Sequence, residues 1–186
     1  MKIAVLFPGI GYHCDKPLLY YAAKLARECG YERIVKVGYG GFETGIKGDV
    51  EKMKRAAQHA YAEAVSILSD REKIVWEEYE EILFLSKSVG TYVAAAYSAA
   101  HDLKARQVFY TPLAETLSAA GDEAIAFSGT GDPWVDPEQI KDLCAQKKIL
   151  LYRYEGVNHS LESGDPLRDL EVLKDVMIKT RERILS

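Results

Sequence analysis

The sequence predicts an α/β fold in which helices cover both faces of a parallel sheet of about six strands, as a three-layer α/β/α sandwich. Short apolar runs of β-type residues alternate with segments of helical periodicity along the chain. The first run, residues 2–7, is apolar almost throughout, which is typical of a strand buried on both faces. With 186 residues and no repeat or linker, one domain spanning residues 1–186 is expected.

Six strands follow from the apolar runs and from the turn residues that close them. Pro8 and Gly9 end the first run, and Thr111 and Pro112 end the fourth. Parallel strands need crossover connections, and the helical segments between the runs provide them. The predicted strands span residues 2–7, 32–37, 82–85, 106–110, 123–128 and 149–154.

The helices are placed by capping residues and apolar periodicity. Asp15 is a candidate N-cap for the first helix, with Pro17 in the first turn and Gly30 as the stop signal. A long second helix opens at Asp49, with apolar residues at helical spacing. The predicted helices span residues 16–29, 49–68, 89–102, 137–147 and 166–184. Residues 113–120 fit either a short helix or an ordered loop, and residues 69–79 are assigned no strand.

The composition is that of an ordinary globular protein, and it narrows the choice of partners. A net charge of −4 argues against nucleic acid or an anionic membrane as the main partner. No apolar run approaches the roughly 20 residues that span a bilayer, and the N-terminal run is too short for a signal peptide.

The cysteines (Cys14, Cys29 and Cys144) are odd in number and lack metal-ligand spacing. We therefore expect free thiols, no bound metal or cofactor, and a cytoplasmic location.

The third apolar run passes without a spacer into a helical segment, and a serine lies at the junction. The junction reads Ser86-Lys87-Ser88-Val89-Gly90, an S-x-S-x-G pattern. A tight strand-to-helix turn holds the central serine in a strained conformation, and it needs small side chains two residues before and two after. Ser86 and Gly90 meet that requirement. The pattern therefore predicts a nucleophile elbow with Ser88 as its nucleophile.

Two further strand ends carry residues that complete this chemistry. In a parallel sheet the functional loops gather at the carboxyl ends of the strands. Asp132 follows the fifth predicted strand, and His159 follows the sixth. Hydroxyl, acid and imidazole then occur in the order of a Ser-Asp-His triad. Ser88 would attack a carbonyl carbon, His159 would carry its proton, and Asp132 would hold the imidazole tautomer.

An oxyanion hole is expected from the first strand end and from the elbow itself. The loop Pro8-Gly9-Ile10-Gly11 follows the first strand. The backbone amides of Ile10 and Val89 would bind the oxyanion, and the helix that begins at Val89 adds its N-terminal dipole.

These motifs resemble the α/β-hydrolase superfamily over essentially the whole chain. PGIG resembles the loop that places the first oxyanion amide, SKSVG the elbow, AFSGTGDPWV the acid loop, and GVNHSLE the histidine loop. The resemblance implies six parallel strands with the elbow strand near the centre, and a member without a cap domain. The chain departs from the common pattern at Ser86, where glycine is usual, and at Pro8, where histidine is common.

Each assigned role has a competing residue. Ser86 is the alternative hydroxyl, and Asp136 or Glu155 could replace the acid. Cys14 lies near the oxyanion loop and fits a wall residue better than a nucleophile, and Lys87 is expected to point away from the site. The remaining histidines (His13, His59 and His101) fit surface or helix positions. Gly11, Tyr12 and Trp134 are candidates for the walls of the substrate pocket. The glycine-rich loop at residues 38–48 lacks the Gly-Lys-Ser/Thr ending of a phosphate-binding loop.

The sequence thus predicts a serine hydrolase that cleaves a small ester, thioester or amide through an acyl-enzyme. Its partner would be a small-molecule acyl substrate, and the absence of a lid suggests a shallow, open pocket. Two alternatives remain: an acyltransferase with the same triad, and a non-catalytic binding protein that retains the fold.

Overall fold

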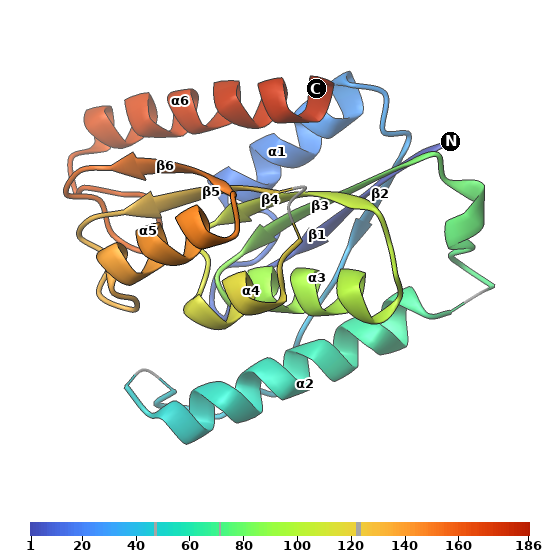
Figure 1. The fold of residues 1–186 in the computed structure, drawn as a ribbon, viewed down its shortest axis with the longest axis horizontal. Helices are drawn as coiled ribbons and strands as arrows, with labels where there is room; N and C mark the ends of the chain where they lie inside the picture. Colours follow the sequence, from blue (N-terminus) through green and yellow to red (C-terminus); the bar gives the residue numbers. More distant parts are fainter. Residues whose placement is uncertain (47, 71, 122–123) are drawn as a thin grey trace.

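A computed structural model describes residues 1–46, 48–70, 72–121 and 124–186 of the chain. Its described strands form one all-parallel sheet in the order β2-β1-β3-β4-β5-β6 (Figure 1). The strands are β1 (Lys2–Phe7), β2 (Arg33–Lys36), β3 (Glu81–Lys87), β4 (Ala105–Tyr110), β5 (Ala124–Gly129) and β6 (Leu150–Tyr154). Residue 123, where the fifth strand is predicted to begin, lies outside the described residues.

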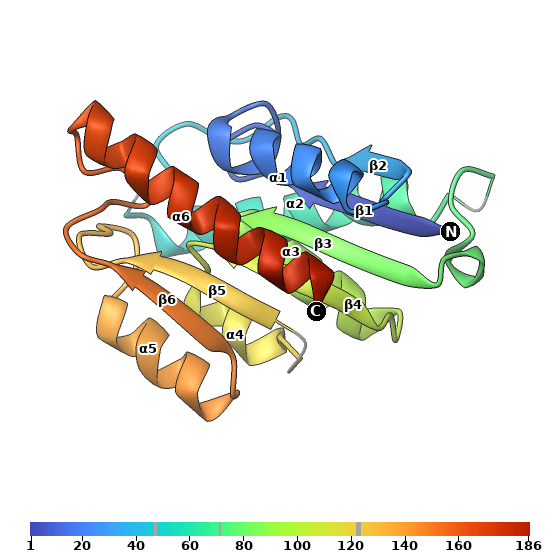
Figure 2. The ribbon, with the colours of Figure 1, turned by 90° about the horizontal axis from the view of Figure 1, so that it is seen from above.

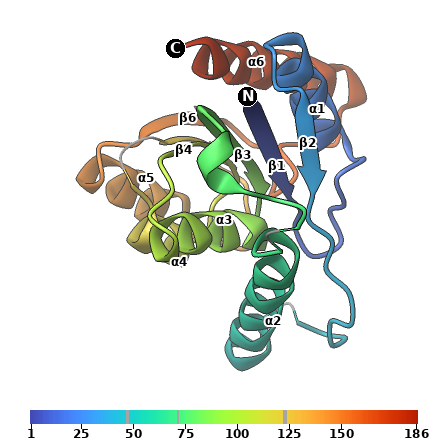
Figure 3. The same cartoon turned by 90° about the vertical axis from the view of Figure 1, so that its right-hand side faces the viewer.

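Helices cover both faces of the sheet. They are α1 (Pro17–Glu28), α2 (Val50–Leu68), α3 (Val89–Ala100), α4 (Ala114–Ala119), α5 (Pro137–Gln146) and α6 (Pro166–Leu185), with a 3-10 turn at Trp76–Glu78. Helices α1 and α6 lie side by side on one face, as the view from above shows (Figure 2). The end-on view shows α2 and α3 on the opposite face (Figure 3). The predicted three-layer α/β/α sandwich is confirmed.

The central strands are buried on both faces, which explains their continuous apolar runs. In β3, Leu83 and Leu85 pack into the cluster beneath α1 and α6, whereas Phe84 packs into the cluster against α2 and α3. Strand β1 divides its side chains in the same way, with Leu6 on the first side and Val5 on the second. Alternate side chains point to opposite faces of a strand, so both faces must be apolar here.

The first helix begins differently from the prediction. Lys16, not Asp15, occupies the N-cap position, and its side chain makes no capping hydrogen bond. The amide of Leu18 instead donates to the hydroxyl oxygen of Tyr12, at 3.1 Å. Asp15 pairs with Lys36 on the surface. A tertiary contact therefore replaces the local cap that the sequence suggested.

The order of the strands fixes where a site can form. The chain runs from β1 outward to β2 and then returns to place β3 on the other side of β1. The carboxyl ends of β1 and β3 therefore border a topological switch point, where ligands bind in open α/β sheets. Among the described residues, none of the helices combines the length and apolar character needed to span a bilayer.

Candidate active site

Ser88 occupies a strained turn between β3 and α3. Its backbone angles are φ 55° and ψ −125°, and its amide donates to the carbonyl oxygen of Tyr110 at 3.0 Å. Such angles are costly for a residue with a side chain and persist only where the surroundings enforce them. Helix α3 begins at the next residue, Val89. The local geometry is therefore that of a nucleophile elbow.

Gly90 is small because the end of β1 passes directly against it. A Cβ atom at this position would lie 2.3 Å from the carbonyl oxygen of Phe7 and 2.4 Å from that of Pro8. Ser86, the small residue on the other side of the elbow, is fully buried, and its hydroxyl donates to the carbonyl oxygen of Val108. The Ser86 hydroxyl is therefore engaged by the backbone of β4, and Ser88 is the serine that lies at the turn.

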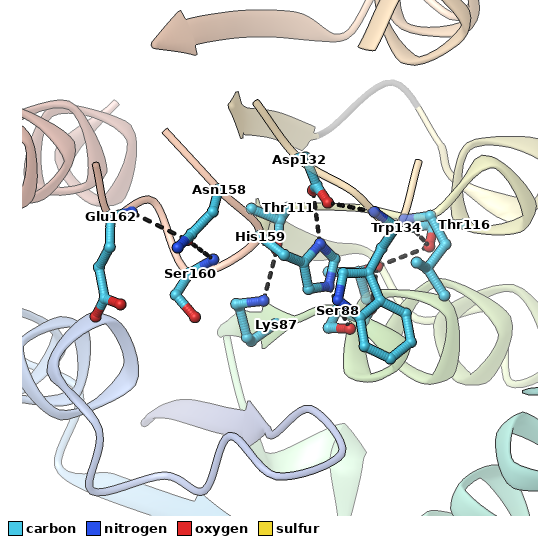
Figure 4. A network of polar contacts seen from close by, with 12 residues as sticks. Lys87, Ser88, Thr111, Thr116, Asp132, Trp134, Asn158, His159, Ser160 and Glu162 are labelled. Atoms are coloured by element: carbon cyan, nitrogen blue, oxygen red, sulfur yellow. Dashed lines mark hydrogen bonds and ion pairs between the residues drawn. The ribbon is translucent and has the colours of Figure 1, made fainter. Parts of the chain in front are cut away.

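The structure brings Ser88, His159 and Asp132 into one hydrogen-bonded chain (Figure 4). Nε2 of His159 lies 2.7 Å from Oγ of Ser88, and Nδ1 lies 2.6 Å from Oδ2 of Asp132. The Asp132 side chain is almost completely buried, whereas 14% of the His159 side chain is exposed. An imidazole held in this way can take a proton from the hydroxyl while the carboxylate fixes its tautomer.

The loops that carry Asp132 and His159 are locked against each other. A Cβ atom on Gly129 would lie 2.2 Å from the carbonyl oxygen of Val157, so glycine permits this close approach. The amide of Gly131 donates to that same oxygen at 3.0 Å. The amide of Gly156 donates to the hydroxyl of Thr130 at 2.8 Å. These contacts join the ends of β5 and β6.

Trp134 fixes the acid and borders the imidazole. Its amide donates to Oδ1 of Asp132 at 2.9 Å, which leaves Oδ2 directed at His159. Its indole ring is tilted by 31° against the His159 ring, with 5.7 Å between the ring centroids. The Trp134 side chain is partly exposed. The role of Trp134 as a wall of the substrate pocket stays a prediction.

The histidine loop is built around Asn158. The side-chain oxygen of Asn158 accepts a hydrogen bond from the amide of Ser160 at 2.7 Å and a longer one from that of Glu162. The Asn158 amide donates to the carbonyl oxygen of Glu162 at 2.8 Å. An asparagine that bonds its own backbone two residues on forms an Asx turn, which here presents His159 to Ser88.

The environment of His159 favours its neutral form. Burial lowers the pKa of the imidazole, and the hydrogen bond to Asp132 opposes that effect. The positive charge of Lys87 lowers the pKa further. The net direction is downward, so His159 is available as a base in neutral solution.

The loop after β1, Pro8-Gly9-Ile10-Gly11, lies against the elbow. We call it the oxyanion loop because it carries one of the two expected oxyanion donors. Gly9 and Tyr12 exchange backbone hydrogen bonds of 3.0 and 3.2 Å, which closes a turn around Ile10. A Cβ atom on Gly9 would lie 3.1 Å from Cβ of Ser88. Within the described part of the chain, the amides of Ile10 and Val89 donate no hydrogen bond. Both N–H groups are therefore available to a ligand, and their role as oxyanion donors stays a prediction.

The other two candidates for the pocket wall differ in exposure. Gly11 is exposed, with φ 71°, whereas Tyr12 is largely buried between the oxyanion loop and α1.

Asp136 caps α5 through the amides of Glu138 and Gln139. Glu155 is exposed. Cys14 is buried, and burial raises the pKa of its thiol to about 11, which makes it a poor nucleophile at neutral pH.

Sequence reasoning missed two supports of the site. Thr91 donates to the carbonyl oxygen of Ser88 at 2.6 Å, and its hydroxyl lies 2.7 Å from that of Thr116. Lys87 is enclosed beneath the loops, with Nζ 2.6 Å from the hydroxyl oxygen of Thr111. A threonine in the first turn of α3 was a local signal for the first contact. Nothing in the sequence marks Thr111 as the partner of Lys87.

An apolar groove of about 370 Å³ lies beside the elbow helix. It runs between α2 and α3, and it is lined by residues that include Val50, Met53, Tyr92 and Leu113. Tyr92 is one helical turn beyond Ser88 on α3. In the described residues, no group of three His, Cys, Asp or Glu side chains is placed to hold a metal ion.

Comparison with solved structures agrees with this architecture. XC6422 from Xanthomonas campestris, described as an α/β serine hydrolase without a lid, superposes with a TM-score of 0.63 at 16% identity, over 98% of this chain and 80% of that one. The chain has the α/β-hydrolase fold. The expected cap-free form of this fold is thereby confirmed.

Two further structures show the same α/β-hydrolase fold. An α/β serine hydrolase homologue from Coxiella burnetii has a TM-score of 0.63 at 16% identity, over 100% of this chain and 83% of that one. Est1E from Butyrivibrio proteoclasticus has a TM-score of 0.68 at 12% identity, over 100% and 89%. No protein-family model matches the sequence, and no curated protein matches it. At these identities the likeness establishes the fold, and the site must carry the function.

Proposed function

We propose that the protein is a serine hydrolase that cleaves a small carboxylic ester, thioester or amide through an acyl-enzyme on Ser88. The observation that carries this proposal is the continuous hydrogen-bonded chain from Asp132 through His159 to Ser88. It lies at the carboxyl edge of a parallel sheet, where α/β-hydrolase folds hold their active sites. The hydrolases among the solved structures of this fold support the same class of reaction.

In the first half of the proposed reaction, Oγ of Ser88 attacks the substrate carbonyl carbon as its proton passes to Nε2 of His159. Asp132 stabilises the imidazolium through Nδ1–H. The amides of Ile10 and Val89 bind the oxyanion of the tetrahedral intermediate. Collapse of this intermediate breaks the bond to the leaving group, which takes the proton from His159 and departs.

The second half repeats these roles with water as the nucleophile. His159 takes a proton from water, the resulting hydroxide attacks the acyl carbon, and a second tetrahedral intermediate forms in the same oxyanion hole. Its collapse returns the proton from His159 to Oγ of Ser88 and releases the acid. The partly exposed imidazole is accessible to this water.

The surroundings of Ser88 favour a substrate with an apolar part, and we take a carboxylic ester as the default. The groove between α2 and α3 is lined by Tyr92, one helical turn beyond Ser88, and its lining is mainly apolar. The polar members of the lining are Lys54, Gln58 and Glu115. The indole ring of Trp134 lies beside the imidazole and adds an aromatic surface to the site. One solved structure of the same fold is Est1E with ferulic acid bound. We propose an aryl or short alkyl ester as the substrate class.

An active-site fluorophosphonate probe tests the assignment. It phosphonylates a serine only when a neighbouring base activates the hydroxyl. We expect labelling of the wild-type protein on Ser88, loss of labelling in Ser88→Ala and His159→Ala, and retained labelling in the matched control Ser86→Ala. Peptide mapping of the adduct identifies the modified residue. Equal labelling of Ser88→Ala and wild type would refute the proposal.

A panel of nitrophenyl esters and thioesters then resolves the acyl preference. Release of free acid at the rate of nitrophenol release identifies water as the acceptor. A product that depends on an added alcohol, amine or thiol would identify acyl transfer instead.

A further inference from the structure

Lys87 is buried directly beside the nucleophile. Only 1% of its surface is exposed, although lysine is among the residues most rarely found inside a protein. Its Nζ donates to the hydroxyl oxygen of Thr111 at 2.6 Å and lies 5.1 Å from the centroid of the Tyr12 ring. In the described part of the chain, no carboxylate forms an ion pair with it. Burial of this ammonium group without a carboxylate partner costs folding free energy, and packing alone does not explain why a lysine occupies this position.

The contacts of Lys87 join three strand ends. Tyr12 belongs to the loop after β1 that carries Ile10, and Thr111 follows β4. Thr111 has φ 48°, an unfavourable conformation for a β-branched residue, and its amide donates to the carbonyl oxygen of Phe127 at 2.8 Å. The Lys87–Thr111 bond thus reinforces a strained turn, and Lys87 itself immediately precedes Ser88.

The charge of Lys87 acts on the proposed base. Burial lowers the pKa of Lys87 to about 7, against a raising effect of Asp132 and a smaller one of Glu162, while Lys16 lowers it further. Tyr12 stays neutral, because burial raises its pKa to about 12. For His159, burial lowers the pKa first, the hydrogen bond to Asp132 raises it, and the Lys87 charge lowers it again.

We propose that Lys87 is a positioning residue: its buried ammonium group ties the oxyanion loop to the end of β4 and helps to keep the His159 imidazole unprotonated in the free enzyme. This inference rests on the proposed hydrolase reaction for its catalytic consequence. Its electrostatic part concerns the protein without substrate.

The sign of the effect follows from the charges. In acidic solution Lys87 is protonated, and its positive charge opposes a second positive charge on His159. Replacing Lys87 by methionine removes that opposition, so His159 takes up a proton at higher pH than in the wild type. The acidic limb of kcat/KM must then move to higher pH, because the protonated imidazole cannot act as a base.

The test is a titration of His159 by NMR in wild type and in Lys87→Met, with His159→Gln used to assign the resonance among the four histidines. We expect the His159 midpoint to move to higher pH in Lys87→Met. In the ester assay, kcat/KM should fall about three- to tenfold more at acidic than at alkaline pH. The matched control Lys174→Met, which removes an exposed lysine from α6, should leave the midpoint unchanged. An unchanged midpoint in Lys87→Met would overturn the proposal.

A second pair of variants keeps the test valid if Lys87→Met fails to fold. Thr111→Val removes the oxygen that stabilises the ammonium group, so Lys87 loses its proton more readily and the His159 midpoint should rise. Thr111→Ser retains the hydroxyl and should behave as wild type. Equal midpoints in Thr111→Val and Thr111→Ser would contradict the proposed role.

These readouts separate the inference from the function on which it rests. A shifted His159 titration in a protein that hydrolyses no ester and binds no fluorophosphonate would refute the hydrolase proposal and uphold the electrostatic role of Lys87. An active hydrolase in which His159 has the same midpoint in Lys87→Met and wild type would uphold the hydrolase proposal and refute the electrostatic role of Lys87.

Discussion

At the scale of single residues, Asp132 has its two carboxylate oxygens assigned to different partners. One accepts from the amide of Trp134 and the other faces Nδ1 of His159. With both acceptor sites engaged and the side chain buried, the carboxylate has one orientation. That orientation selects the imidazole tautomer in which Nε2 is free to accept the proton of Ser88.

Asp132→Asn should therefore keep the fold and lose most of the activity. The asparagine fits the same space, but its NH₂ group can donate to Nδ1 and stabilise the wrong tautomer, which lowers kcat by about 10³–10⁴-fold. Ester turnover and the rate of fluorophosphonate labelling measure this loss.

Asp136→Asn is the matched control for this change. Asp136 lies on the same loop but caps α5, and asparagine is an equally good N-cap, so kcat should remain near wild type. Wild-type turnover in Asp132→Asn would assign the acid to another carboxylate.

At the scale of elements, the elbow depends on how closely α3 approaches the end of β1. The first turn of α3 passes so near β1 that Gly90 has no room for a side chain. The same approach sets the oxyanion loop against Ser88, since Gly9 is only two residues beyond Phe7. The position of the helix thus fixes both the nucleophile and the proposed oxyanion donors.

Gly90→Ala should destabilise the protein by about 2 kcal/mol or more, because its Cβ meets backbone that cannot move aside without displacing β1. Ester turnover should fall by more than the loss of folded protein accounts for, because relief of the clash moves the oxyanion loop away from Ser88. Urea unfolding and ester turnover measure the two effects.

Gly38→Ala is the control for the effect of an added methyl group. An added Cβ there meets nothing within 4 Å, and the backbone angle does not require glycine. Its stability should match wild type. Equal stabilities for Gly90→Ala and Gly38→Ala would show that the elbow tolerates a side chain.

The elements and the triad were accessible from sequence because each rests on a local pattern. Apolar runs predict the strands to within one or two residues, and chain order predicts Ser88, Asp132 and His159, which the structure places within hydrogen-bond distance. Contacts between distant loops were not accessible. The sequence led us to expect that Lys87 points away from the site, and only the fold reveals that Tyr12 and Thr111 enclose it. Asp15 failed as a cap because the Tyr12 hydroxyl takes its place.

At the scale of the whole molecule, the buried Lys87 makes stability depend on pH. Its pKa is about 7 in the folded protein and close to 10.5 when unfolded. Between these values the unfolded chain binds more protons, so the stability of the wild type rises as pH increases. The cost of burying the charge is complete below about pH 7 and fades towards pH 10.

Lys87→Met lacks this dependence. Relative to wild type, Lys87→Met should have a higher free energy of unfolding at pH 6 than at pH 9. The advantage of the variant should be larger at pH 6 by roughly 2–3 kcal/mol. Urea unfolding at both values gives the difference, and Lys174→Met supplies the reference for loss of an exposed charge. Parallel pH profiles for Lys87→Met and wild type would show that Lys87 has an ordinary pKa.

The all-parallel sheet also governs when activity can first arise during folding. Every neighbouring pair of strands is joined only after a crossover through a helix, and the pairing of β3 with β1 must bypass β2 and α2. Such non-local pairings form slowly. Ser88 and His159 are 71 residues apart in sequence, and β4, β5 and β6 must all dock before they meet. A nascent or partly folded chain therefore carries the serine without its base, and the onset of turnover reports completion of the sheet.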